Sequence, residues 1–232
     1  MNRALIAVAK RPQAGRTKTR LCPPLSPQQA AELYSCFMVD TLALMARVDS
    51  VDPIVAYAPL SAETYFRQRV APSFALLPQV GKELGERLNH VLNRCLDMGY
   101  EQVAVMNSDS PTMPRHHLRQ AFALLDRPEV DVVLGPTDDG GYYLIGLKRP
   151  CPRLFDVTMS TTSVLQETLA LARAEGLRVE CLPSWYDVDT VHDLNRLVAE
   201  LASLPEDVAP ETRRFLKRWQ NEEPTDSSVS GA

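Results

Sequence analysis

Cations and carboxylates gather in short, separate stretches of this sequence. Residues 10–20, KRPQAGRTKTR, carry five cationic side chains and no acid. Three other stretches are acidic: NSDSP at 107–111, DDGG at 138–141 and YDVD at 186–189. Lysine and arginine bind phosphate groups, and carboxylates hold the Mg²⁺ that neutralises them. Together these stretches indicate phosphate chemistry, provided that one fold brings them to the same place.

The basic loop stands out because the chain is acidic overall. The formal net charge is −4, and from Glu32 onward 19 bases face 29 acids. A nucleic-acid surface would need further basic faces or interleaved aromatic residues. A solvated charged turn and a phosphate cradle are the other interpretations. The cradle is favoured because the loop follows an apolar segment and Gly15 lets the backbone turn tightly towards a ligand. The loop matches neither the Walker A pattern nor G-x-G-x-x-G.

The aspartate of NSDSP is the leading metal-ligand candidate. Asp109 follows an apolar run directly, so its carboxylate is expected to project from the end of a strand. Such an aspartate can also be a helix cap. A polyphosphate site, however, needs Mg²⁺ (or Mn²⁺), which one or two carboxylates hold together with phosphate oxygens.

Two further aspartates can complete that metal site. Asp187 and Asp189 are two positions apart, so on an extended segment both point the same way. One of them is expected to bind the metal and the other to cap the helix that follows, with Asp189 placed slightly ahead of Asp187 as the ligand.

The DDGG stretch predicts a tight turn between two strands, with glycines supplying positive φ. Beyond that structural role, Asp139 is expected to face the pocket. Gly140 and Gly141 are expected to let a substrate approach closely, which makes these three residues candidates for substrate binding.

Alternating strands and helices must position these stretches. Apolar runs predict strands, and apolar residues at helical spacing predict helices between them, the first capped by Ser26 with Pro27 at its first position. This pattern predicts an α/β fold with a mostly parallel sheet and helices on both faces. The strands are expected at 4–9, 53–58, 74–79, 103–107, 131–137, 142–147 and 177–182, and the helices at 28–48, 61–71, 84–96, 114–125, 162–174 and 190–201. In such sheets the ligand lies at the carboxyl ends of the strands, where the charged stretches fall.

The remaining bulk features indicate one soluble domain. We expect one nucleotide-binding domain at 1–205 and a C-terminal helix and loose tail at 206–232. The five cysteines are scattered without a C-x-x-C pair, which argues against a disulfide framework or a zinc site. No segment predicts a signal peptide or a membrane span, so a cytoplasmic location is expected, without membrane or nucleic-acid partners. A homodimer is left open.

Six ordered stretches carry a resemblance to a known family. AKRPQAGRTKTRL, QVGKELGERL, NSDSPTMP, VVLGPTDDGGYYLIGL, MSTTSVLQETL and YDVDTVHDL resemble the DUF2064 family, whose members are called radical-SAM/selenodomain-associated transferase 1 or glycosyltransferase. The chain is also similar to the 2-phospho-lactate guanylyltransferases, whose opening loop has a similar K-T-R-L pattern. The resemblance implies a single Rossmann-like GT-A domain (the nucleotide-diphospho-sugar transferase fold) with a mixed, mostly parallel seven-stranded sheet. Many relatives read G-S-D where this chain has Asn107-Ser108-Asp109.

The resemblance implies a Mg-dependent, nucleotide-using transferase. A nucleotidyltransferase, moving an NMP from an NTP to a small phosphorylated or acidic acceptor, is favoured because its leaving pyrophosphate needs many cations. A GT-A glycosyltransferase and a non-catalytic nucleotide-binding protein are the alternatives. The catalytic residues would be Lys18, Arg16 and Asp109. The nucleotide-binding residues would be Lys10, Gly15, Arg16, Lys18, Arg20, Gly81, Gly85 and Arg87.

Overall fold

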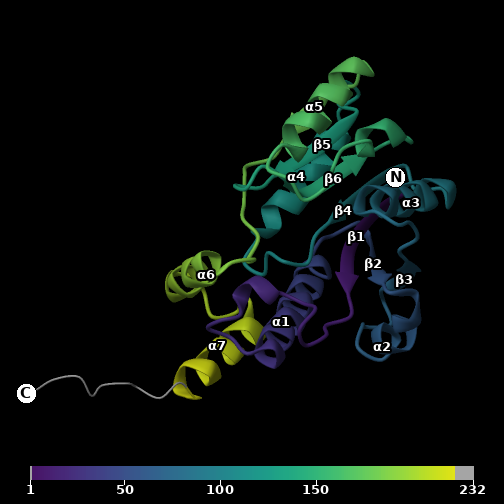
Figure 1. Cartoon of the computed structure of the whole chain (residues 1–232). Coiled ribbons are helices and arrows are strands. Elements are labelled where there is room, and N and C mark those ends of the chain that lie inside the picture. The colour runs from purple at the N-terminus through teal and green to yellow at the C-terminus, as the bar shows by residue number, and fades with distance from the viewer. Residues whose placement is uncertain (1, 223–232) are drawn as a thin grey trace, which may run out of the picture.

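The computed structural model describes residues 2–222, and the loose tail expected near the C-terminus lies mostly outside them. A seven-stranded sheet forms the centre, in the order β3-β2-β1-β4-β6-β5-β7 (Figure 1). The strands are β1 (Arg3–Lys10), β2 (Asp52–Ala58), β3 (Ala75–Pro78), β4 (Gln102–Met106), β5 (Val132–Pro136), β6 (Tyr142–Leu147) and β7 (Val179–Cys181). This is the seven-stranded sheet that the resemblance implied.

One strand runs against the others. β6 pairs antiparallel with both β4 and β5, whereas β1 pairs parallel with β2 and β4, and β5 pairs parallel with β7. The carboxyl ends of the six parallel strands therefore share one edge of the sheet. The expected mostly parallel, mixed sheet is confirmed.

Helices cover both faces because residues along each strand alternate between two cores. Leu5 and Ala7 of β1 face a core shared with the first, second and fourth helices, and Ala4 and Ile6 face a core shared with the third and fifth. The helices are α1 (Pro27–Met45), α2 (Glu63–Arg67), α3 (Leu84–Asp97), α4 (Arg115–Leu125), α5 (Val164–Ala174), α6 (Val191–Ser203) and α7 (Pro210–Glu222).

A third core ties the C-terminal helices to the N-terminal half of the chain. Phe37 of α1 packs in one cluster with Leu197 of α6 and Phe215 of α7, and the three helices lie together in Figure 1. Asp40 of α1 accepts hydrogen bonds from the backbone N–H groups of Glu211 and Thr212, so it caps the start of α7. The helix expected within 206–232 thus exists and lies on α1.

Local signals explain most helix ends. Ser26 caps α1 through a capping box with Gln29, and Pro27 is its first residue, as predicted. The helix predicted at 61–71 is shorter: a 3-10 turn spans Leu60–Ala62, and α2 ends at Arg67. Ser61 does not cap it. The chain turns instead, which brings Val70 and Phe74 into the core.

The expected aspartate cap of α6 is wrong. Thr190 caps this helix, in a capping box with Asp193, because its hydroxyl lies one position closer to the first turn. Neither Asp187 nor Asp189 has a capping role, so both are left for other contacts. Within the described residues, no helix is long and apolar enough to cross a membrane.

Candidate active site

Lys18 joins the basic loop to two of the acidic stretches. Its Nζ lies 2.7 Å from Asp109 Oδ1 and 2.6 Å from Asp189 Oδ1. The Lys18 side chain is only 6% exposed, whereas both aspartate side chains are 30% exposed. The three residues are far apart in the sequence, and the fold brings them to one point at the carboxyl edge of the sheet. The structure thus brings together three of the predicted site residues, Lys18, Asp109 and Asp189.

The loop conformation turns Lys18 inward. Gly15 has a φ of 73° and Lys18 a φ of 50°, and a 3-10 helix (Thr19–Leu21) starts directly after Lys18. A left-handed φ is uncommon for a residue with a side chain. Here it places the ammonium 5.9 Å from the ring centre of Tyr34 and 6.0 Å from that of Phe37. These rings on α1 help to desolvate the cation.

Lys18 remains charged in this environment. Its burial alone would favour the neutral amine, but the carboxylates of Asp109 and Asp189 outweigh that effect and raise the pKa of Lys18 above its ordinary value. The site therefore holds a permanent positive charge between two carboxylates.

Two loops from distant parts of the chain form the acidic side of the site. The backbone N–H of Val188 donates to the carbonyl oxygen of Asp109 at 3.0 Å, and Ser110 Oγ donates to the carbonyl oxygen of Tyr186 at 2.9 Å. The isolated bridge between Thr137 and Trp185 continues this contact towards β5. The segment after β7 is thereby fixed alongside the end of β4.

Asp187 lies deeper than its neighbour. Its Oδ1 accepts hydrogen bonds from Asn107 Nδ2 at 2.6 Å and from Ser110 Oγ at 2.8 Å. Burial, followed by repulsion from Asp109, raises the pKa of Asp187 to about 7. Asp189, not Asp187, shares the Lys18 ammonium with Asp109, and the ranking of Asp189 ahead of Asp187 as a metal ligand stays a prediction.

The buried hydroxyl groups of Tyr34 and Ser108 contact each other and the end of β1, next to Asp109. Tyr34 OH lies 2.9 Å from Ser108 Oγ, which donates to the carbonyl oxygen of Val8 at 3.0 Å, and the backbone N–H of Lys10 donates to Tyr34 OH at 3.1 Å. Burial, and then the charge of Asp109, raises the pKa of Tyr34 to about 12, so the phenol stays protonated. Sequence reasoning missed Tyr34, Ser108 and Asn107. Of these three, only Asn107 was marked in the sequence, because many relatives have glycine at this position.

The donors present fit a hard divalent cation. Asp109 Oδ1 is buried and, within residues 2–222, meets the Lys18 ammonium alone, and with Asp189 it already converges on this one positive charge. Carboxylate oxygens are the ligands that Mg²⁺ and Mn²⁺ prefer, and a nucleotide-binding Mg²⁺ takes only one or two of them. Among the described residues no cluster of three or more metal-ligating side chains exists. Any metal here would therefore depend on phosphate and water for its remaining ligands.

The other residues of the basic loop lie at the surface around Lys18, Asp109 and Asp189. Arg20 is 67% exposed and contacts Asp189 Oδ2 at 2.5 Å. Lys10, Gly15 and Arg16 are exposed, and neither Lys10 nor Arg16 forms an ion pair within residues 2–222. Their predicted phosphate contacts remain predictions.

The 81–87 segment lies at the same edge but is organised by its own contacts. Arg87 donates from Nε to the carbonyl oxygen of Gly81 at 2.9 Å and from Nη2 to that of Lys82 at 2.7 Å. A Cβ on Gly85 would come within 2.8 Å of the carbonyl oxygen of Phe155. Gly85 thus permits the close approach of α3 to residues 152–155, and nucleotide contact by this segment stays a prediction.

The 138–141 turn is held internally. Asp139 Oδ1 accepts hydrogen bonds from Thr137 Oγ1 at 2.6 Å and from the Gly141 N–H at 3.2 Å. Gly140 has a φ of 92°, as predicted, and a Cβ there would lie 2.0 Å from the carbonyl oxygen of Thr162. Gly141 does not have a positive φ, so only one glycine fulfils that expectation. The close approach at Gly140 is made by the chain itself, and substrate binding by these residues remains a prediction.

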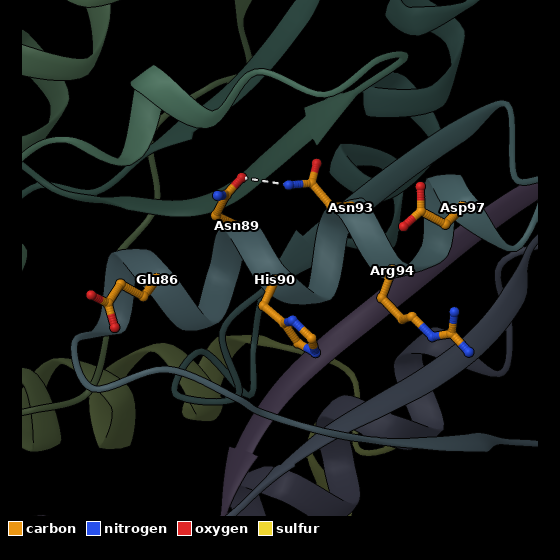
Figure 2. Close-up of a pocket in the computed structure, with 6 residues that line it drawn as sticks. All are labelled: Glu86, Asn89, His90, Asn93, Arg94 and Asp97. Carbon is orange, nitrogen blue, oxygen red and sulfur yellow. Dashed lines mark hydrogen bonds between the residues drawn. The ribbon is translucent and has the colours of Figure 1, made fainter.

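Two open hollows lie elsewhere on the surface. One, of about 300 Å³, runs along the outer face of α3, where Glu86, Asn89, His90, Asn93, Arg94 and Asp97 line it (Figure 2). The other, of about 330 Å³, is lined by Arg11, Ser61, Thr64, Tyr65, Gln68 and Arg69. Neither includes Lys18 or its carboxylates.

The fold of the chain matches the folds of solved nucleotide-using transferases. A CMP-2-keto-3-deoxy-manno-octonic acid synthetase matches with a TM-score of 0.58 at 12% identity, over 87% of this chain and 99% of that one. A cytidylyltransferase from Leptospira borgpetersenii matches with a TM-score of 0.55 at 10% identity, over 95% of this chain and 96% of that one. At such identities the likeness concerns the fold alone.

Two more similar proteins share both sequence and length. A protein from Desulfovibrio desulfuricans G20, proposed to be a nucleotide-diphospho-sugar transferase, matches with a TM-score of 0.88 and 33% identity over 95% of this chain and 96% of that one. The 2-phospho-L-lactate guanylyltransferase of Methanothermobacter thermautotrophicus is 30% identical over 190 residues, which are 78% of each chain.

The family expectation is confirmed. Residues 41–161 match the model of DUF2064, described as an uncharacterized protein conserved in bacteria, and the chain belongs to this family. With a guanylyltransferase and a nucleotide-diphospho-sugar transferase relative among its matches, it is an enzyme of the transferase class.

Proposed function

We propose that the protein is a nucleotidyltransferase that moves an NMP group from an NTP to a small phosphorylated or acidic acceptor. The observation that carries this proposal is the meeting of Lys18, from a loop of five cations, with Asp109 and Asp189 at the carboxyl edge. A relative that is a guanylyltransferase supports the same reaction type.

In this reaction an acceptor phosphate or carboxylate oxygen attacks the α-phosphorus of the NTP. The bond from the α-phosphorus to its bridging oxygen breaks, and pyrophosphate leaves with that oxygen and the electron pair. Negative charge grows on the leaving group, so cations positioned beside it lower the barrier. Lys18, Arg16 and Arg20 are the side chains we assign to this role.

The carboxylates would serve a divalent cation. Asp109 and Asp189 would hold Mg²⁺ or Mn²⁺, which would supply further neutralisation of the phosphates. Asp187 lies behind them, with its oxygen bonded to Asn107 and Ser110, and acts as a positioning residue.

Pyrophosphate release tests the reaction. The purified protein is incubated with Mg²⁺, each NTP in turn, and a panel of small phosphorylated acids that includes 2-phospho-L-lactate. We expect acceptor-dependent pyrophosphate release with at least one pair, and its loss when Mg²⁺ is chelated. The Asp109→Asn variant serves as the control for contaminating activity.

Thermal shift separates the alternative functions. The glycosyltransferase alternative has a specific observation in its favour, the 33% identity to the Desulfovibrio protein. Stabilisation by nucleotide-diphospho-sugars alone, without NTP-dependent pyrophosphate release, would replace our proposal with glycosyl transfer. Stabilisation by nucleotides without turnover of any acceptor or sugar donor would instead leave a nucleotide-binding protein.

A further inference from the structure

We propose that Lys18 and a divalent cation compete for the same carboxylate oxygens, so that metal enters the site only together with nucleotide phosphates. This inference rests on the proposed use of a nucleotide, and it assigns Lys18 a second role as a tethered cation that closes the metal site.

The contacts of Lys18 are those that a metal would need. Its ammonium takes one oxygen from Asp109 and one from Asp189, at 2.7 and 2.6 Å. Asp109 Oδ1 is buried, and among residues 2–222 the Lys18 ammonium is its one polar contact. Two positive charges a few ångströms apart repel strongly where water is excluded. A metal bound to both oxygens therefore requires the ammonium to leave.

Leaving is costly unless the ammonium finds a new anionic partner. At 6% exposure, Lys18 cannot recover its hydration in place, and an unpaired buried cation is strongly unfavourable. Metal alone offers no such partner. The phosphates of a nucleotide do, since they carry several negative charges and bind ammonium groups well.

The surroundings let Lys18 move between the two partners. Its side chain is a flexible four-carbon stem, and its backbone lies in the left-handed region at a φ of 50°, between the loop and the 3-10 helix. Arg20 contacts the other oxygen of Asp189 and is 67% exposed. Arg20 can therefore keep one charge near Asp189 without occupying the oxygens that face Asp109.

Reciprocity makes the consequence measurable. If nucleotide releases the carboxylates for metal, nucleotide must tighten metal binding, and metal must tighten nucleotide binding by the same factor. Removing the positive charge of Lys18 should tighten metal binding to the protein alone and weaken this mutual effect.

Free Mn²⁺, measured by electron paramagnetic resonance, tests the competition directly. Mn²⁺ is titrated against the full chain, alone and with saturating GTP or CTP, for the wild type, Lys18→Met and Arg20→Met. Free nucleotide also binds Mn²⁺, and this share is subtracted. For the wild type we then expect nucleotide to tighten Mn²⁺ binding to the protein about tenfold or more. Lys18→Met, without nucleotide, should bind Mn²⁺ about tenfold more tightly than the wild type. Arg20→Met, which removes an exposed cation from the same carboxylate, should change the affinity by less than about threefold.

The outcomes distinguish this inference from the proposed reaction. The competition would be overturned if Lys18→Met and the wild type, both folded by circular dichroism, bound Mn²⁺ equally well without nucleotide. This outcome would not contradict the proposed release of pyrophosphate by the wild type. Should Lys18→Met fail to fold, tight Mn²⁺ binding by the wild type alone, unchanged by nucleotide, would overturn it equally. A tighter Mn²⁺ site in Lys18→Met, together with a wild-type protein that releases no pyrophosphate with any NTP, would support the competition and count against nucleotidyl transfer.

Discussion

Two acidic loops lie at the same edge of the sheet and use their carboxylates in opposite ways. The loop after β4 contributes Asp109, whose Oδ1 is buried and meets the ammonium of Lys18, a residue from a distant part of the chain. The 138–141 loop between β5 and β6 contributes Asp139, whose Oδ1 bonds to Thr137 and Gly141 two residues away on either side. In sequence both are aspartates that follow apolar strands.

The difference lies in what remains for a ligand. Asp139 Oδ1 already accepts two hydrogen bonds within its own turn, so its loss is a loss of local structure. Asp109 and Asp189 hold the ammonium of Lys18, which phosphate would draw away in the proposed competition, so their loss would remove chemistry. Long-range ion pairs at a strand edge thus indicate a reactive site better than acidity does.

The largest expected effect is that of Asp109→Asn. We expect pyrophosphate release to fall by about 100-fold or more, because the carboxylate that would hold the metal becomes a neutral amide. Asp139→Asn, the matched change in the other loop, should retain activity within about threefold, since an amide oxygen can still accept the turn's hydrogen bonds. Equal losses in the two variants would remove the distinction between the loops.

Gly140→Ala should be the most damaging change in the turn itself. A Cβ at this position would lie 2.0 Å from the Thr162 carbonyl oxygen, and the φ of 92° is unfavourable for alanine. We expect the free energy of unfolding to drop by about 1–3 kcal/mol in urea denaturation. Gly99→Ala, which has a φ of 94° but nothing within 4 Å of its Cβ, separates backbone strain from the steric clash. A smaller loss in Gly140→Ala than in Gly99→Ala would show that the loop relaxes freely.

Asn107→Gly tests the support of the acidic side and restores the G-S-D pattern of many relatives. The variant loses the 2.6 Å hydrogen bond to Asp187 Oδ1. We expect destabilisation of about 1–2 kcal/mol in urea, because a partly buried carboxyl group loses a donor and the backbone gains freedom. Unchanged stability together with unchanged Mn²⁺ binding would mean that Ser110 alone suffices to hold Asp187.

Asp138→Ala should have the smallest effect. Its ion pair with Arg196, at 2.7 Å, lies between side chains that are 48% and 44% exposed. Such surface pairs contribute less than about 1 kcal/mol. A shift of a few degrees at most in thermal denaturation, with full activity, is the expected result, and an activity loss comparable to that of Asp109→Asn would assign this loop to the active site after all.

The sequence predicted the sheet because its signals are local. The unbroken apolar run at 4–9 and the Ser26-Pro27 start of α1 each depend on near neighbours, and both are found in the structure. The helix predicted at 61–71 ends early, at Arg67, and Val70 and Phe74 beyond it pack into the core.

The meeting of the basic and acidic stretches at one edge of the sheet was predictable, but the pairing of their side chains was not. Strand ends identified Asp109, and spacing identified Asp187 and Asp189, yet only the fold decides that Asp189 reaches Lys18 while Asp187 turns to Asn107. Tyr34 carries no signal in the sequence, because a helical tyrosine is ordinarily a core residue. Its polar tip becomes relevant only through the proximity of Ser108.

The distribution of the site along the chain has a consequence for synthesis in the cell. Lys18 is synthesised before Asp109, and Asp109 before Asp189, so the ammonium cannot meet both carboxylates until translation has passed residue 189. An interrupted product therefore has the basic loop without both of its carboxylate partners.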